Sequence, residues 1–323
     1  MDSLSVSLDG IATEIRRLKI DLKQLILDIE NPRIQYFLDT RLNDDITQEK
    51  IKFALAEGND QYEKLKEHIE RNGGIYDPIW VVSKEKFYTV IEGNTRAFIY
   101  EELSEKYVND NKWRSIDAYV LPYKVNRNVI NFIRLEKHLF GPTPWDAYEK
   151  ARELYRLHTE EDYSLKRLEQ LTKLAASDIR NNIQAFMDME EQYLHKYNKP
   201  AERLKFSYFV EFRKNKELRR LVKEGRLSLM DFCEWVGEGK FRRGEDIRKL
   251  SFVLKDEESR QALINNNFQA VLDQLEQRNP AAKSKLFEKI EEVTDGLEGI
   301  PFGELDEIKR GLQPARLACI IPV

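Results

Sequence analysis

Residues 88–97 read YTVIEGNTRA and contain the signals of a strand, a tight turn and a helix in immediate succession. Gly93 admits the backbone conformations that a tight turn requires, and Asn94 and Thr95 are residue types favoured at a helix N-cap. The free N–H groups of a helix start attract anions, and Arg96 stands beside them. The stretch therefore predicts a phosphate-binding turn. The alternative is a structural turn in which Arg96 pairs with a carboxylate.

The sequence on both sides of this turn predicts a domain of mixed strands and helices. Apolar residues at helical spacing fill residues 47–71, and Gly73-Gly74 is a strong signal for the end of that helix. Period-two and short apolar runs indicate strands nearby. The other expected elements are a short amphipathic helix over residues 11–19 and strands over 78–82, 87–91 and 116–123.

From residue 126 onward the sequence reads as almost wholly helical. We therefore expect an α+β N-terminal domain over residues 1–125, a helical linker with a helix-turn-helix over 126–198, and an all-α C-terminal domain over 199–323. The helices expected first are 128–139, 145–158, 164–171 and 177–189.

The composition excludes several classes of protein. The 323 residues are 34% charged with a net charge of −4, so any nucleic-acid site must be a local basic surface. The two cysteines and four histidines are scattered and lack zinc-site spacing. The first ten residues have no basic region followed by a long apolar run, and no segment reaches membrane-spanning length. We expect a cytoplasmic protein with no membrane partner.

Four short motifs occur in a characteristic order. They are NPR at 31–33, a helix ending in Gly-Gly with PIWVV at 78–82 after it, EGNTR at 92–96, and LEKHLFG at 135–141. This order resembles the nucleotide-binding domain of the ParB/sulfiredoxin superfamily, over roughly residues 20–160, and the chain continues into a helix-turn-helix as ParB does. The resemblance implies a ParB/sulfiredoxin-like α+β domain that binds a nucleoside triphosphate with Mg²⁺.

The resemblance also implies which residues form the nucleotide site. In the family pattern, Glu136 matches the acidic residue near the metal and the triphosphate, whereas Lys137 stands where a metal-binding Asn is expected. The turn has no Cys, so the sulfiredoxin reaction lacks its nucleophile. The positions that match the phosphate loop and the segment beside the base and phosphates are Gly74, Pro78, Gly93, Asn94, Thr95 and Arg96.

The charged residues of these motifs are the candidates for chemistry. Glu92 and Glu136 are expected to hold Mg²⁺ with phosphate oxygens, and to orient or deprotonate an attacking group if phosphoryl transfer occurs. Arg33 is expected to reach the same phosphates. The alternatives are that Glu92 stabilises the following helix dipole, that Glu136 pairs with Lys137 or Arg134 on a helix surface, and that Arg33 is an exposed turn residue.

Residues 164–186 have the apolar spacing of a helix-turn-helix. Ser164 and Ser177 are expected to cap its two helices. Glu169 stands in place of the usual small residue, and Lys173 in place of the usual turn glycine, so the alternative is a packing unit that contacts a protein. The residues expected to contact DNA are Lys166, Ser177, Arg180, Asn181 and Gln184.

Residues 203–226 are locally basic, with interleaved aromatic residues. Basic side chains near aromatic rings suit nucleic acid, and the alternative is an amphipathic helix with a solvated basic face. A second basic stretch, residues 239–244, suits nucleic acid or a loop that caps the next helix.

Taken together, these observations favour a ParB-like DNA-associated protein that binds a nucleoside triphosphate at residues 92–96 and uses it to switch contact with DNA or a partner, with hydrolysis left open. The first alternative is a nucleotide-hydrolysing, kinase-like or nuclease enzyme of the same superfamily, associated with phage defence or a mobile element. The second is an interaction module that binds no nucleotide. A homodimer through the C-terminal helices is compatible with the sequence.

Overall fold

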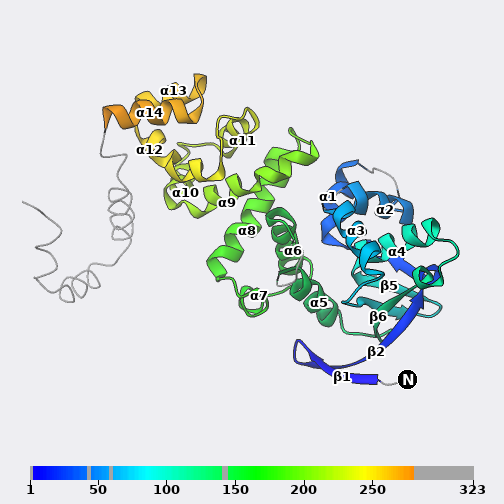
Figure 1. Cartoon of the computed structure of the whole chain (residues 1–323). Helices are drawn as coiled ribbons and strands as arrows, with labels where there is room; N and C mark the ends of the chain where they lie inside the picture. The colour runs from blue at the N-terminus through cyan, green and yellow to red at the C-terminus, as the bar shows by residue number, and fades with distance from the viewer. Residues whose placement is uncertain (1–2, 42–44, 58–60, 140–144, 280–323) are drawn as a thin grey trace, which may run out of the picture. The chain divides into compact units, whose positions relative to one another are not determined.

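The computed structural model describes residues 3–41, 45–57, 61–139 and 145–279 (Figure 1). The chain divides into two compact units, Met1–Gly237 and Glu238–Val323. The boundaries predicted after residues 125 and 198 both lie inside the first unit, so the three-part division stays a prediction. Among the described residues, no helix combines the length and the apolar character that crossing a membrane requires.

The first unit contains a six-stranded mixed sheet with the strand order β1-β2-β6-β4-β5-β3. Strands β4 and β5 form an antiparallel hairpin, whereas β4 runs parallel to β6 and β3 runs parallel to β5. The predicted hairpin and the strand that follows it are therefore confirmed. The strands are β1 (Ser3–Leu8), β2 (Ile11–Asp21), β3 (Leu25–Leu27), β4 (Ile79–Lys84), β5 (Phe87–Glu92) and β6 (Ser115–Leu121).

Both faces of this sheet are covered by helices, and the alternation of side chains along β4 shows it. Val81 belongs to the core formed with the helices α1 to α4, whereas Trp80 and Val82 pack with Val129 and Ile133 of α5 on the other face. The helices are α1 (Pro32–Arg41), α2 (Gln48–Glu57), α3 (Tyr62–Asn72), α4 (Asn94–Lys106) and α5 (Arg127–Leu139), with 3₁₀ turns at Leu22–Gln24 and Asn111–Arg114.

Two of the predicted elements are corrected by the structure. Residues 11–19, expected as a helix, lie in β2, which pairs antiparallel with β1 and β6. Its burial alternates from residue to residue, with Thr13 and Ile15 buried and Glu14 exposed. The helix expected over 47–71 is two helices, α2 and α3, and the residues 58–60 between them lie outside the described part. The α3 helix ends at Gly73 in the left-handed conformation, as predicted.

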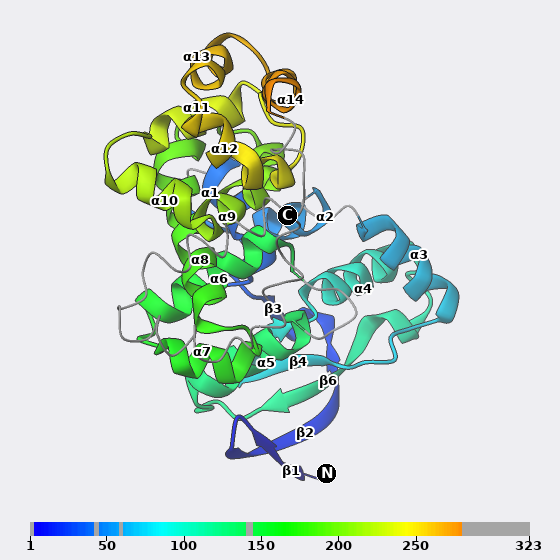
Figure 2. The same ribbon diagram turned by 90° about the vertical axis from the view of Figure 1, so that its left-hand side faces the viewer.

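The rest of the first unit is helical (Figure 2). Helix α6 begins with a capping box between Asp146 and Glu149. The helices are α6 (Ala147–Thr159), α7 (Leu165–Thr172), α8 (Ala176–Asp188), α9 (Phe206–Lys214), α10 (Lys216–Lys223) and α11 (Leu229–Gly237), with a π-helical turn at Met189–Leu194 and a 3₁₀ segment at Pro200–Lys205. The predicted class, α+β followed by all-α, is confirmed.

The second unit is a small helical body with its own core. Phe241, Ile247, Leu263 and Phe268 are buried in it. Its helices are α12 (Leu250–Lys255), α13 (Glu257–Asn265) and α14 (Phe268–Arg278), after a 3₁₀ segment at Gly244–Lys249. The basic stretch at 239–244 serves this fold. Lys240 Nζ donates to the carbonyls of Leu263 and Ile264, and the backbone N–H groups of residues 242 and 243 donate to Asp246. These contacts confirm the capping role of that stretch, and its contact with nucleic acid stays a prediction.

Candidate functional site

A cavity of about 280 Å³ lies in the first unit at the start of α4. Its walls come from the residues before and at the start of α1, from α3 and the loop after it, from the turn between β5 and α4, and from the end of α5. Of these walls, only the β5–α4 turn belongs to the stretch 88–97 with which the sequence analysis began. The lining residues are Asn31, Arg33, Leu65, His68, Ile69, Gly74, Ile75, Tyr76, Asp77, Glu92, Gly93, Asn94, Thr95, Arg96, Lys137 and His138.

The turn itself confirms the predicted strand, turn and helix. Gly93 is the N-cap of α4, has φ of 92° and provides no side chain to bond the first N–H groups of the helix. A Cβ at this position would lie 2.4 Å from Ile79 Cγ2. The turn therefore requires glycine both for its conformation and for its close approach to β4.

Asn94 and Thr95 are not the caps that the sequence suggested. Both lie inside the first turn of α4 and are buried. The Asn94 side chain accepts a hydrogen bond of 2.8 Å from the Asp28 backbone N–H. Because no side chain caps α4, the helix start remains available to an anion in the cavity.

Arg96 is held by carboxylates, as the structural alternative proposed. Its Nη2 atom lies 2.6 Å from both Glu92 oxygens, and its Nη1 atom lies 3.8 Å from Asp77 Oδ2. Asp77 also accepts from Lys137 Nζ at 2.9 Å. The Asp77 side chain is 52% exposed, whereas that of Glu92 is 10% exposed. Glu92 is therefore a fixed partner of Arg96, and Asp77 is an exposed bridge between Arg96 and Lys137.

The structure brings most of the predicted site residues together. Arg33, Gly74 and the whole of 92–96 line the cavity. Pro78 is buried in the segment that leads into β4 and is not among the lining residues. Glu136 is exposed on α5 and does not line the cavity either, so its role near a ligand stays a prediction. Arg134, one of its suggested partners, pairs with Asp28 and Glu30 instead.

Sequence reasoning missed several lining residues, because they come from other elements. Leu65, His68 and Ile69 have the i, i+3, i+4 spacing of one helix face, which was the available signal for the α3 wall. Tyr76 is 82% exposed in the loop after α3. His138 stacks on Trp145 with ring centroids 4.5 Å apart and also lines the cavity.

The structure does not bring the two carboxylates of the predicted Mg²⁺ site, Glu92 and Glu136, into the same cavity. Both Glu92 oxygens face Arg96, and Glu136 lies outside the cavity. Across the described ranges, no group of three or more His, Cys, Asp or Glu side chains is placed to hold a metal ion. The cavity instead contains the ammonium group of Lys137 among its charges.

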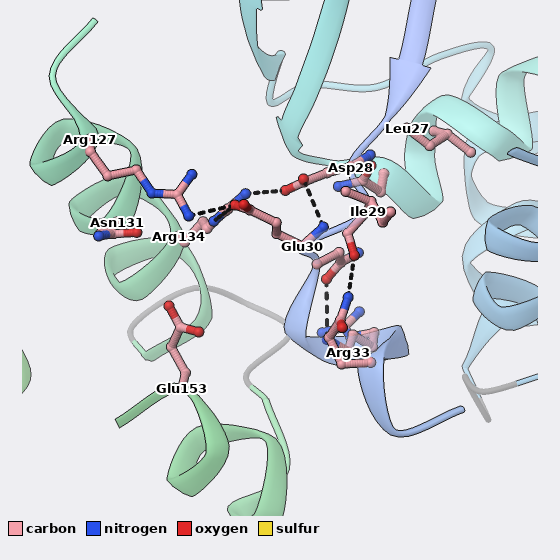
Figure 3. Close-up of polar contacts among 12 residues, drawn as sticks. Leu27, Asp28, Ile29, Glu30, Arg33, Arg127, Asn131, Arg134 and Glu153 are labelled. Carbon is pink, nitrogen blue, oxygen red and sulfur yellow. Dashed lines mark hydrogen bonds and ion pairs between the residues drawn. The ribbon is translucent and has the colours of Figure 1, made fainter. Parts of the chain in front are cut away.

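A partly buried ionic network connects the segment before α1 to α5 (Figure 3). Arg134 donates to Asp28, and its Nη1 atom lies 3.1 Å from Glu30 Oε2. Glu30 also pairs with Arg127 at 2.6 Å. Burial raises the pKa of the Asp28 carboxyl, and Arg134 opposes this rise. On α6, Arg156 bonds Asn131 Oδ1 of α5 at 3.0 Å. The network fixes Asp28, and therefore the Asn94 contact, to the helices beyond the sheet.

Helices α7 and α8 lie where the helix-turn-helix was predicted, with one cap reassigned, and their identity as a DNA-binding helix-turn-helix stays a prediction. Ser164 Oγ accepts from the Arg167 N–H at 3.2 Å, as predicted. Ser177 is not a cap: the N-cap of α8 is Ala175, and Glu169 Oε1 accepts from the Ala176 N–H at 2.8 Å. Glu169 therefore caps α8 across the turn. Lys173 occupies the left-handed turn position with φ of 59°.

The residues expected to contact DNA differ in their exposure. Lys166, Ser177 and Arg180 are exposed, and Asn181 is half-buried. Gln184 is half-buried and bonds Asp188 at 3.3 Å. Their contact with DNA stays a prediction.

The three phenylalanines of the basic segment 203–226 form part of the core, whereas Tyr208 is half-buried. Phe206, Phe209 and Phe212 are buried, and Phe209 and Phe212 both contact the Phe232 ring. Arg213 pairs with Asp188. The amphipathic-helix reading of these aromatics is therefore right.

Comparisons with known proteins give structural similarity alone. No protein-family model and no curated protein matches the chain. The Pnob8-like ParB-N domain is similar at 13% identity and a TM-score of 0.40, over 80% of this chain and 97% of that one. The structure of C-terminally truncated chromosome-partitioning ParB from Caulobacter crescentus, complexed to the centromeric parS site, is similar at 11% identity and a TM-score of 0.36. This match covers 67% of this chain and 97% of that one. The structure of the same truncated protein complexed with CTP-γ-S is similar at 12% identity and a TM-score of 0.25, over 65% of this chain and 98% of that one.

Proposed function

We propose that this chain is a ParB-like, DNA-associated protein that binds a nucleoside triphosphate in the cavity at the start of α4 and uses it to switch its contact with DNA or a partner. The observation that carries the proposal is the convergence of Arg33, Arg96 and Lys137 on one cavity with an uncapped helix start. These cations outnumber the lining carboxylates, Asp77 and Glu92.

The cationic groups suit the phosphates of the ligand. Backbone N–H groups at a helix N-terminus and arginine side chains are the usual donors to phosphate oxygens. Arg96 is pre-oriented by Glu92, which leaves the exposed Asp77 as the group that a phosphate replaces between Arg96 and Lys137.

The remaining walls suit a nucleotide base. Leu65, Ile69 and Ile75 supply apolar surface, and Tyr76 supplies an exposed aromatic ring. Apolar and aromatic walls with a few polar anchors are typical of small-molecule sites.

Positive charge from the protein takes the place that the resemblance gives to Mg²⁺. Lys137 supplies an ammonium group inside the cavity, and the two lining carboxylates, Asp77 and Glu92, are both paired with cations of the protein. We therefore infer that binding of the nucleotide does not depend on a divalent ion.

Contacts within the first unit support the switching role. Asn94 of the cavity holds the Asp28 backbone, Asp28 is paired with Arg134 of α5, and α5 packs on α7 of the helix-turn-helix. A ligand that displaces the start of α4 or the segment before α1 acts on this connection.

Calorimetric titration of the purified chain with CTP, ATP, GTP and UTP, each with Mg²⁺ and with EDTA, tests the proposal. We expect one nucleotide to bind with similar affinity in both buffers. Lys137→Ala and Arg96→Ala are expected to weaken binding at least tenfold, and Arg17→Ala, an exposed arginine of β2, is the matched control. Binding of no nucleotide would refute the proposal, and binding that neither site variant changes would refute the site.

A phosphate-release assay decides between this proposal and the enzyme alternative. Release that Glu136→Ala stops, while binding persists, favours a nucleoside triphosphatase. For the helix-turn-helix, Arg180→Ala is expected to weaken binding of duplex DNA measured at low salt, because an exposed arginine on α8 contacts bases or phosphates.

A further inference from the structure

Helix α10 carries a stripe of cations on its exposed face. Residues 214–226 read KNKELRRLVKEGR, with six basic and two acidic side chains in a chain whose net charge is −4. Four of the cations follow one another at i, i+3, i+4 and i+7, so they share one side of the helix. We define the α10 stripe as Lys216, Arg219, Arg220 and Lys223, all of them exposed.

Carboxylates of the protein neutralise only part of the stripe. Glu217 lies 2.6 Å from Arg220, and Glu224 lies 3.8 Å from the same side chain. Lys216, Arg219 and Lys223 form no ion pair with any residue in the described ranges. Within the stripe these two glutamates pair with Arg220 alone, while Glu224 also lies 3.8 Å from Arg226 outside the stripe, so three cations of the stripe are left for an external anion.

The spacing of the stripe costs the helix stability. Like charges at i, i+3 and i, i+4 repel each other. Arg219 and Arg220 stand at these spacings from both Lys216 and Lys223. A solvated helix face gains nothing from this arrangement, because alternating signs would keep it equally soluble. An anionic partner turns the repulsion into attraction.

The chemistry of α10 decides which anionic surface fits. Its apolar residues Leu218 and Leu221 are 0% and 2% exposed and Val222 is half-buried, so the helix has no broad apolar face to insert into a lipid bilayer. A row of long cationic side chains without apolar insertion matches a sugar-phosphate backbone, where each contact neutralises one phosphate.

The surroundings of α10 favour duplex DNA among nucleic acids. Helix α9 packs on α8 of the helix-turn-helix, and α10 packs on α9, all within the first unit (Figure 2). We propose that the α10 stripe is a second, sequence-independent DNA-backbone contact that acts together with α8. The choice of DNA as the partner rests on the proposed function, whereas the cationic surface itself is observed in the structure.

The test uses the full-length chain and a 30-base-pair random-sequence fluorescent duplex, with anisotropy measured between 50 and 200 mM NaCl. The test variant is K216A/R219A/K223A. The matched control is K64A/K84A/K86A, which removes three exposed lysines elsewhere in the first unit. Loss of three phosphate contacts lowers the salt slope by about 2.7, so the affinity ratio between 50 and 200 mM falls about 40-fold relative to the natural chain. The control should keep the natural slope.

A thermal melt of the test variant separates a lost contact from a lost fold. Because the substitutions relieve like-charge repulsion, its melting temperature should equal or exceed that of the natural chain. An unchanged salt slope, no binding of duplex DNA by the natural chain, or tighter binding of single-stranded RNA or anionic vesicles would each overturn the proposal. If Arg180→Ala leaves DNA binding unchanged while the test variant weakens it, the stripe stands and the role of α8 fails; the reverse result removes the stripe alone.

Discussion

Arg134 and Asp28 form an ion pair across 106 residues of sequence, with side chains that are 3% and 5% exposed. A buried carboxylate that loses its partner keeps the full cost of leaving water. We therefore expect Arg134→Met to lower the free energy of unfolding by about 3–5 kcal/mol, measured by urea denaturation at pH 7.

Arg127→Met is the comparison for this change. Arg127 also pairs with Glu30, but its side chain is 40% exposed, and exposed pairs contribute about 1 kcal/mol or less. If the two variants lose equal stability, the Asp28 pair is not the connection described in Figure 3.

Glu149 predicts a pH dependence of stability. Burial, and then the neighbouring Asp146, raises the pKa of the Glu149 carboxyl to about 7, while Arg33 and Arg203 oppose the rise. An acid whose pKa is raised by folding stabilises the protein below its unfolded pKa, near 4.5, and this stability is lost as the pH rises through about 7. The shift corresponds to about 3 kcal/mol at most.

Glu149→Gln isolates this effect, because glutamine also completes a capping box at this position. Unfolding measured from pH 4.5 to 8.5 should show the natural chain losing stability relative to the variant as the pH rises. Parallel curves for the two proteins would show that Glu149 ionises without cost in the folded state.

The sequence predicted the β5–α4 turn well because every signal for it is local. The change from β-branched residues to helical spacing, and the glycine between them, all lie within ten residues. The rest of the cavity comes from segments far away in sequence, such as Lys137 and the face of α3 around His68. Motif order suggested that these segments meet, but it could not show that Lys137 rather than Glu136 points to the cavity.

Residues 11–19 show where a local pattern is ambiguous. Ile11, Ile15 and Leu18 fit helical spacing, and the same segment also carries the period-two set that the structure buries. Pairing with β1 and β6 decides for the strand. Because one of these partners is about 100 residues away, the segment alone does not contain the information.

Gly93→Ala tests the turn. The substitution forces a side chain into left-handed backbone and against Ile79, so we expect a loss of about 2–4 kcal/mol in unfolding free energy. Gly225→Ala has a similar φ of 69° and open space around the added Cβ. It should lose only about 1–2 kcal/mol. Equal losses of unfolding free energy in the two variants would mean that the close contact with β4 does not add to the cost of a side chain at Gly93.

Lys173→Gly should stabilise the first unit. Lys173 is in the left-handed conformation at the end of α7, where a Cβ costs about 1 kcal/mol that glycine avoids. A rise of about 1 kcal/mol in unfolding free energy is expected. The same substitution at Lys166, inside α7, should lower stability by a similar amount. A loss at Lys173 would show that its side chain contributes more than the strained backbone costs.

Asp77→Asn tests the position of the phosphates. Asp77 bridges Lys137 at 2.9 Å and Arg96 at 3.8 Å, so its carboxylate competes with any anion for the same two cations. Removing its charge should tighten nucleotide binding by about two- to fivefold, the equivalent of an exposed ion pair. Calorimetric titration at low salt measures this change.

Glu67→Gln is the charge-matched control, because Glu67 is exposed on α3 and does not line the cavity. It should leave the affinity unchanged, since a carboxylate outside the cavity does not compete for Arg96 and Lys137. Weaker binding in Asp77→Asn would mean that the carboxylate helps to hold the ligand. The phosphates would then lie elsewhere along the cavity, toward Arg33. The proposal that the Lys137 ammonium group substitutes for a metal ion would then be wrong.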